Sequence, residues 1–155
     1  MKEVNKLPDI TNNFVEQFFL NNFDIDRVFN SIERADYLFL YYIKSIVDAH
    51  EGNERVYLSD LADAMNLSIP ELSREIEKLQ DKGYVMWKTD SEAGKTYVKL
   101  TSKAVELMRD EIRWMKNCYT RIREEIGEDE LEKASETVKK INAILKEMKQ
   151  TQASE

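Results

Sequence analysis

The chain has 155 residues, of which 42% are hydrophobic and 34% are charged. This balance is typical of one folded, helix-rich domain (residues 1–155) and excludes a largely disordered chain. No run of about 18 apolar residues predicts a transmembrane helix, and the N-terminal residues lack the pattern of a secretory signal. The chain is therefore expected in the cytoplasm, as its single cysteine, Cys118, also favours. The net charge of −7 lowers the expectation of nucleic-acid binding but leaves room for a local basic surface.

Two helices are predicted in the N-terminal third. Apolar residues from Phe14 onward recur at helical spacing and indicate an amphipathic helix to about Asn30. A strongly apolar run then predicts a buried helix from Ser31 to about Ala49. Residues 50–53, with a glycine, are expected to end it.

The middle of the chain predicts two short helices followed by a β-hairpin. The helices are expected at about Ser59–Met65 and Pro70–Lys82, with Asn66 in the turn between them because asparagine tolerates the left-handed conformation. Ser68-Ile69-Pro70-Glu71 has the pattern of a capping box, serine at the cap and glutamate three residues later. Two β-prone runs, residues 84–89 and 95–100, flank a turn-rich connection.

The C-terminal third predicts two long helices, at about 103–126 and 129–149, separated by Gly127. Thr101 and Ser102 offer an N-cap for the first of them. Their apolar faces are too extensive for the remaining core of a monomer, so a homodimer is expected. The dimerisation helices would be at about 10–31 and 103–150.

The order of elements at about residues 57–101 predicts a winged helix-turn-helix. At 100° per residue, Leu72, Ile76 and Leu79 form the buried stripe of the second helix. The opposite side would enter the major groove of duplex DNA, with Arg74 best suited to a bidentate guanine contact. The candidate DNA contacts on this helix are Ser68, Ile69, Pro70, Ser73, Arg74 and Lys78.

The hairpin would be the wing of this fold. It carries positive charge and a hydroxyl donor suited to phosphates or the minor groove, on Lys88, Lys95, Thr96 and Lys99.

Residues 58–101 resemble the winged-helix core of the MarR family. The closest match is Leu79-Gln80-Asp81-Lys82-Gly83-Tyr84-Val85, followed by Asp90 and then Val98-Lys99-Leu100-Thr101. The resemblance implies a mainly α fold with a small β-hairpin, and N- and C-terminal dimerisation helices. It also implies a homodimeric transcriptional regulator that binds a pseudo-palindromic duplex. Repression is favoured over activation. A small aromatic ligand would release the DNA.

The chain departs from the family pattern at the wing. Where members commonly carry arginines after the wing aspartate, residues 91–94 are Ser-Glu-Ala-Gly. Acidic residues also dilute the charge of the recognition helix. The alternative function is therefore a winged-helix protein-interaction module with weak or no DNA binding.

Several features have two interpretations. Arg74 and Lys78 either contact DNA or pair with glutamates at helical spacing. The aromatic residues Phe14, Phe18, Phe39, Tyr41, Tyr42 and Trp114 either line an effector pocket or belong to core and interface. Cys118 is either an oxidant sensor or, more in keeping with its surroundings, a buried, inert thiol. No catalytic motif, metal site or cofactor is expected, because one histidine and one cysteine cannot complete a zinc site, and the sequence identifies no effector residues.

Overall fold

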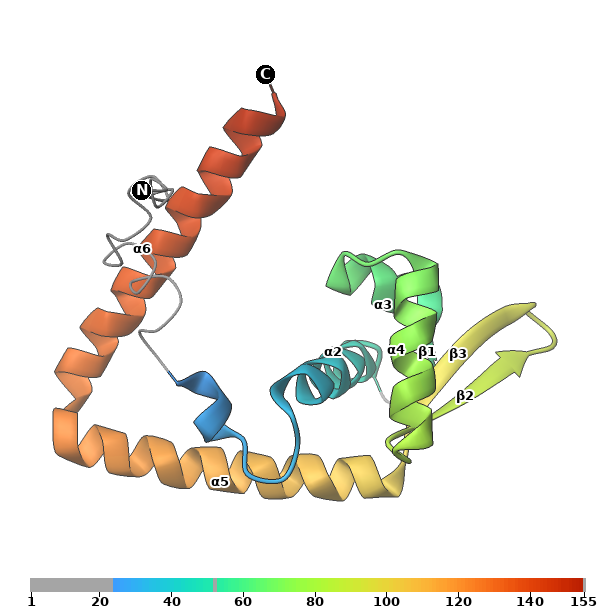
Figure 1. The fold of residues 1–155 in the computed structure, drawn as a ribbon, viewed down its shortest axis with the longest axis horizontal. Helices are drawn as coiled ribbons and strands as arrows, with labels where there is room; N and C mark the ends of the chain where they lie inside the picture. Colours follow the sequence, from blue (N-terminus) through green and yellow to red (C-terminus); the bar gives the residue numbers. More distant parts are fainter. Residues whose placement is uncertain (1–23, 52, 155) are drawn as a thin grey trace, which may run out of the picture. The chain divides into compact units, whose positions relative to one another are not determined.

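The computed structural model describes residues 24–51 and 53–154 and divides into two compact units, residues 1–112 and 113–155. In chain order its elements (Figure 1) are η1 Ile25–Val28, α2 Arg34–Ala49, β1 Val56–Tyr57, α3 Leu58–Met65, α4 Ile69–Asp81, β2 Val85–Asp90, β3 Lys95–Leu100, α5 Ser102–Ile126 and α6 Glu128–Ala153. The first unit holds the elements up to the first part of α5. The fold is a winged helix, as predicted.

The first predicted helix falls largely outside the described residues. Its described end, Ile25–Val28, is one turn of 3-10 helix rather than continuous α-helix. The next helix, α2, begins at Arg34 instead of Ser31. The reason is a long-range contact: the backbone N–H groups of Asn30 and Ser31 donate to the carboxylate of Glu111 at 3.0 and 2.5 Å, so this segment is not free to continue the helix.

The core of the first unit collects apolar side chains from every layer. Each of the three helices α2, α3 and α4 buries one stripe, and the sheet buries one face. The fully buried side chains include Leu40, Ile43, Val56, Leu61, Leu72, Ile76, Leu79, Val85 and Val98.

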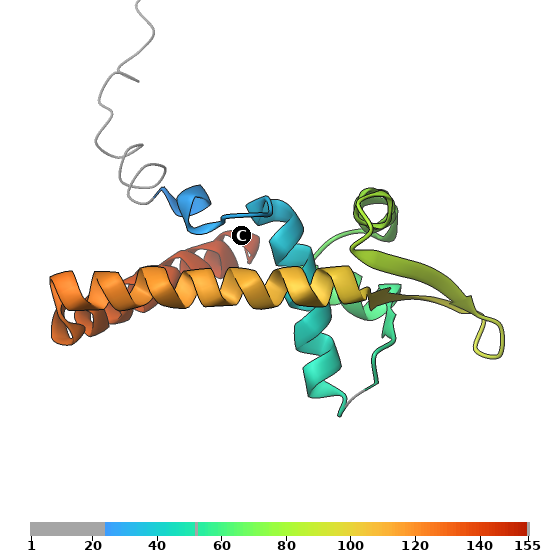
Figure 2. The same ribbon diagram turned by 90° about the horizontal axis from the view of Figure 1, so that it is seen from below.

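The sheet has three antiparallel strands in the order β1-β3-β2, one more than the predicted hairpin. The additional strand, β1, pairs Val56 with Val98 and Tyr57 with Tyr97. The hairpin strands pair from Val85–Leu100 to Asp90–Lys95. In both views the β2–β3 hairpin extends beyond the helices of its unit (Figures 1 and 2), which leaves its tip free to contact another molecule.

The junction between β3 and α5 is tied back to the end of α4. Gly83, at φ +79°, and Tyr84 donate their N–H groups to the carbonyls of Gln80 and Leu79, which is a Schellman ending. Thr101 Oγ1 donates to the Gly83 carbonyl at 2.6 Å and accepts from the Ala104 N–H at 3.2 Å. Thr101 therefore caps α5, as predicted, and also anchors the end of α4.

The second unit comprises the rest of α5 and the whole of α6. Gly127, at φ +100°, separates the two helices, as predicted. None of the residues of α6 is buried. Four of its large apolar side chains are exposed, namely Val138, Ile144, Leu145 and Met148, and so are several on the second half of α5.

Candidate nucleic-acid interface

The turn between α3 and α4 has the conformation that the sequence predicts. Asn66 adopts the left-handed conformation, at φ 54° and ψ 46°. Ser68 Oγ accepts the Glu71 N–H at 3.3 Å, and the Glu71 carboxylate accepts the Ser68 N–H at 2.9 Å. These reciprocal bonds satisfy N–H groups that a helix start otherwise leaves free. They also lower the pKa of Glu71.

This capping box changes the expected role of Ser68. Its hydroxyl donates to the Glu71 carboxylate at 2.8 Å while it accepts from the Glu71 backbone. The hydroxyl is thus engaged within the helix. Its expected contribution to DNA contact becomes indirect, through holding the first turn of α4 in place.

The exposed side of α4 is defined by the three leucine and isoleucine residues that it buries. Leu72, Ile76 and Leu79 are 0–1% exposed, as predicted. Ser73 is half-buried at the edge of this buried stripe. The side chains exposed along the rest of the helix include Ile69, Pro70, Arg74, Glu77 and Lys78.

The two cations of α4, Arg74 and Lys78, differ in their ion pairing. Lys78 Nζ lies 3.0 Å from the carboxylate of Glu75, so for Lys78 the pairing interpretation holds in this structure. Arg74 forms no ion pair within 4 Å with any residue in the described part of the chain, although its charge contributes to lowering the pKa of Glu71. Arg74 is therefore the cation of this helix that is available to a ligand.

One face of the wing holds most of its charged residues. Directly paired residues of an antiparallel sheet share a face, and the face alternates along each strand. The pairs Lys88–Tyr97 and Asp90–Lys95, with Lys99 two residues beyond Tyr97, therefore bring the three predicted lysines together. Thr96 pairs with Thr89 and lies on the other face, so the structure does not join it to the lysines.

The lysines of this face differ in their surroundings. Lys99 Nζ lies 3.0 Å from the Glu54 carboxylate. Lys95 Nζ lies 5.4 Å from the centre of the Tyr57 ring, within cation–π range. Lys88 is exposed and forms no ion pair with any described residue. Lys88 and Lys95 thus remain open to an anion.

Arg55 is a candidate that the sequence analysis missed. It precedes β1, and its guanidinium lies 4.8 Å from the centre of the Tyr97 ring and 3.6 Å from the carboxylate of Asp90. Its side chain is still 49% exposed. The β-prone pair Val56-Tyr57 after Arg55 was the available signal, but two residues are too few to predict a strand.

Asp90 connects this arginine to the tip of the wing. Its carboxylate accepts the N–H groups of Glu92 at 3.1 Å and Ala93 at 3.3 Å, and the hydroxyl of Tyr57 at 3.3 Å. The Ala93 and Glu92 N–H groups lower the pKa of Asp90, and Tyr57 and Arg55 add to the effect. Asp90 therefore fixes the turn at the wing tip and positions Arg55 beside it.

The remaining candidates show no assembled site. Phe14 and Phe18 lie outside the described residues; of the other aromatics, Tyr41 is exposed and packs edge-on against Tyr42. His50 Nδ1 lies 2.7 Å from the Ile46 carbonyl, at the end of α2. Cys118 is partly exposed rather than buried, so the predicted burial of this thiol was wrong. Within residues 24–51 and 53–154 there is no group of metal-ligating side chains and no helix able to cross a membrane.

Comparisons with known proteins agree with the fold. No protein-family model matches the chain, and no curated protein matches it in sequence. Among solved structures, MepR, a transcription regulator of the Staphylococcus aureus multidrug efflux pump MepA, is 18% identical over 74% of this chain and 81% of its own, with a TM-score of 0.55. A mutant of MarR from E. coli complexed with operator DNA is 18% identical over 75% of this chain and 84% of its own, with a TM-score of 0.57. The S. aureus MepR–DNA complex is 18% identical over 74% and 78%, with a TM-score of 0.52.

The chain thus has the winged-helix fold of MarR and MepR, both of which are transcription regulators.

Proposed function

We propose that this protein is a DNA-binding transcriptional regulator of the MarR family that binds a pseudo-palindromic duplex as a homodimer. The observation that carries the proposal is Arg74, an exposed arginine without an ion-pair partner among the described residues, on the outward side of a capped helix. In a helix-turn-helix this side enters the major groove, and a guanidinium fits the two acceptors of guanine.

The fold and the wing support the same function. MarR and MepR, whose fold this chain shares, have both been solved with DNA. We propose direct contacts from α4 and from the charged face of the wing, where Arg55 joins the predicted lysines. Arg55 supplies to the wing the guanidinium that residues 91–94 lack.

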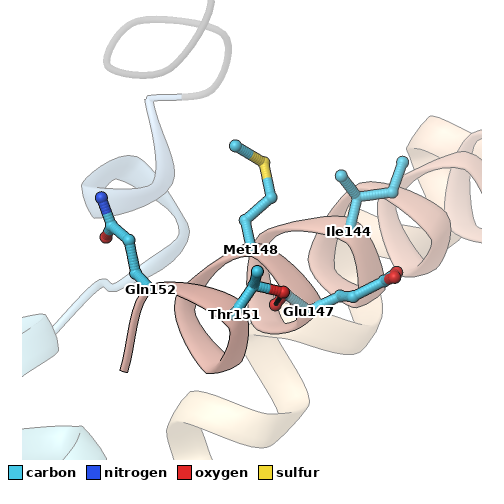
Figure 3. A pocket seen from close by; sticks show the side chains of 5 residues that line it. All are labelled: Ile144, Glu147, Met148, Thr151 and Gln152. Carbon is cyan, nitrogen blue, oxygen red and sulfur yellow. Dashed lines mark hydrogen bonds between the residues drawn. The ribbon is translucent and has the colours of Figure 1, made fainter. Parts of the chain in front are cut away.

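A homodimer is supported by the apolar face of α6. Leu131, Ala134, Val138, Ile141, Leu145 and Met148 alternate at spacings of three and four residues, the pattern of a helix-packing seam. Among the residues that the structure describes, much of this seam is exposed: Met148 is 63% exposed and Leu145 42%. Near the end of α6, Ile144 and Met148 line a shallow hollow together with other side chains of that helix (Figure 3). A second copy would bury these residues, and a monomeric mass by light scattering would contradict the dimer.

In such a dimer the whole of residues 1–155 would act as a single domain in the cytoplasm. Two-fold symmetry would set the two α4 helices about one DNA turn, roughly 34 Å, apart. Repression and release of DNA by a small aromatic ligand are proposed from the family resemblance.

The proposal is tested by titrating the full chain with the duplex upstream of its own coding region at several salt concentrations. We expect binding that weakens as salt rises, and we expect Arg74→Ala to weaken specific binding by about 1–3 kcal/mol. Glu106→Ala, an exposed change on α5, is the control. If Arg74→Ala and Lys95→Ala together left the affinity unchanged, the contact assignment would be wrong.

A protein-interaction module is the second candidate function. It is favoured by the net charge of −7 and by the ion pairs that engage Lys78 and Lys99. Absence of any salt-dependent binding to duplex DNA by the dimer would support this function instead.

A further inference from the structure

The outward side of α4 carries an acidic residue beside Arg74. Glu77 is exposed, and its side chain forms no ion pair or hydrogen bond with any residue in the described part of the chain. Its neighbour Lys78 is directed to Glu75 instead. Glu77 lies three residues after Arg74 on the same side of the helix, so both side chains face whatever the helix approaches.

A carboxylate in this place is costly against DNA unless it meets a hydrogen-bond donor. It repels phosphates, and as an acceptor-only group it also repels the N7 and O6 acceptors of the major groove. The donors available in that groove are the amino groups of cytosine and adenine. Adenine presents its amino group beside the N7 acceptor, whereas cytosine presents a donor alone. A carboxylate therefore favours cytosine.

The spacing of the two residues fits neighbouring base pairs. Three residues of α-helix advance about 4.5 Å along the axis, close to the roughly 3.4 Å between successive base pairs. When Arg74 contacts a guanine, Glu77 lies within about one base-pair step of it.

We infer that Glu77 is a specificity-determining residue, which accepts a hydrogen bond from the amino group of a cytosine next to the guanine contacted by Arg74. The inference rests on the proposed DNA-binding function and names the bases that the recognition helix selects. The acidic character of α4 then acts in selection: it penalises duplexes that lack the donor and so reduces binding to unrelated sequence.

Replacing Glu77 by glutamine tests the inference, because the amide keeps the shape but gains a donor. Glutamine pairs well with the N6 and N7 atoms of adenine. From a pool of randomised duplexes, the full-length protein should enrich half-sites with cytosine at one fixed position, and Glu77→Gln should enrich adenine there. On two duplexes that differ at this base pair alone, we expect a preference of roughly tenfold for cytosine that the variant loses or reverses.

Glu106→Gln, which makes the same charge change on the exposed side of α5, is the matched control and should keep the cytosine preference. Circular dichroism of each variant confirms that it is folded. If the unaltered protein enriches a motif and Glu77→Gln enriches the same motif, the inference is overturned while the proposed function stands. If the unaltered protein enriches no duplex and shows no salt-dependent binding, the proposed function fails and the inference with it.

Discussion

Glu111 offers a test of how the winged-helix unit is held together. Its carboxylate, on α5, is 1% exposed and accepts the N–H groups of Asn30 and Ser31 from a segment 80 residues earlier in the chain. Its charge, after burial itself, is the second cause that raises the pKa of Tyr37. Replacing Glu111 by alanine leaves both N–H groups without their acceptor and opens a space beside the core.

An unsatisfied buried N–H costs about 1–3 kcal/mol. Because Asn30 and Ser31 are themselves exposed, water can reach the freed groups in part, and the low end of this range applies to each. We therefore expect Glu111→Ala to lower the free energy of unfolding by about 2–3 kcal/mol, equivalent to roughly 4–12 °C in Tm for a chain of this length. Glu111→Gln, which keeps one acceptor oxygen, should lose about half as much.

Urea denaturation followed by circular dichroism measures these differences, with Glu106→Ala on the same helix as the control for loss of an exposed glutamate. A loss of less than about 0.5 kcal/mol for both Glu111 variants, the range of ordinary surface changes, would refute the reasoning. It would show that the carboxylate contributes no more than a solvated side chain does.

Two further predictions concern the interface. Ser68→Ala removes the cap of α4 and should cost about 0.5–2 kcal/mol of stability in thermal unfolding, whereas Ser68→Asp should retain most of it because aspartate is an equally good cap. Asp90 should make stability depend on pH: its pKa is lowered in the folded protein, so its contribution is present above the ordinary aspartate range and is lost as pH falls through the folded pKa. Unfolding measured between about pH 6 and pH 2 should therefore show a smaller acid-induced loss for Asp90→Asn than for the unaltered chain; equal losses would contradict this role.

What could be predicted from the sequence was local in origin. The capping box of α4, the left-handed Asn66 and the break at Gly127 each depend on residues within a few positions of one another. The buried stripe of Leu72, Ile76 and Leu79 follows from the helical period alone. For these elements, composition and spacing determine the conformation before the rest of the chain is considered.

The features that escaped prediction depend on contacts distant in the sequence. Strand β1 has two residues and exists because Val56 pairs with Val98. The late start of α2 depends on Glu111, and the position of Arg55 depends on Asp90. The two members of each pair lie too far apart in the sequence for a local pattern of residues to connect them. The sequence of the wing therefore lacks an arginine, although the fold brings Arg55 to it from the position just before β1, the strand next to the hairpin.

The contacts within α4 bear on how an acidic chain could bind DNA as proposed. Helix α4 has two cations and four acidic residues, but the charges are not equivalent. Lys78 and Glu75 pair with each other, and Glu71 is engaged in the helix cap. Arg74 and Glu77 remain on the outward side, together with Asp81 at the end of the helix. In the proposed complex such a surface would neutralise few phosphates, so the affinity for DNA would depend on base contacts and on the fit of the wing. In such an interface an acidic residue on α4 would cost little binding free energy at a DNA site that offers it a hydrogen-bond donor. It would cost much more at other sites.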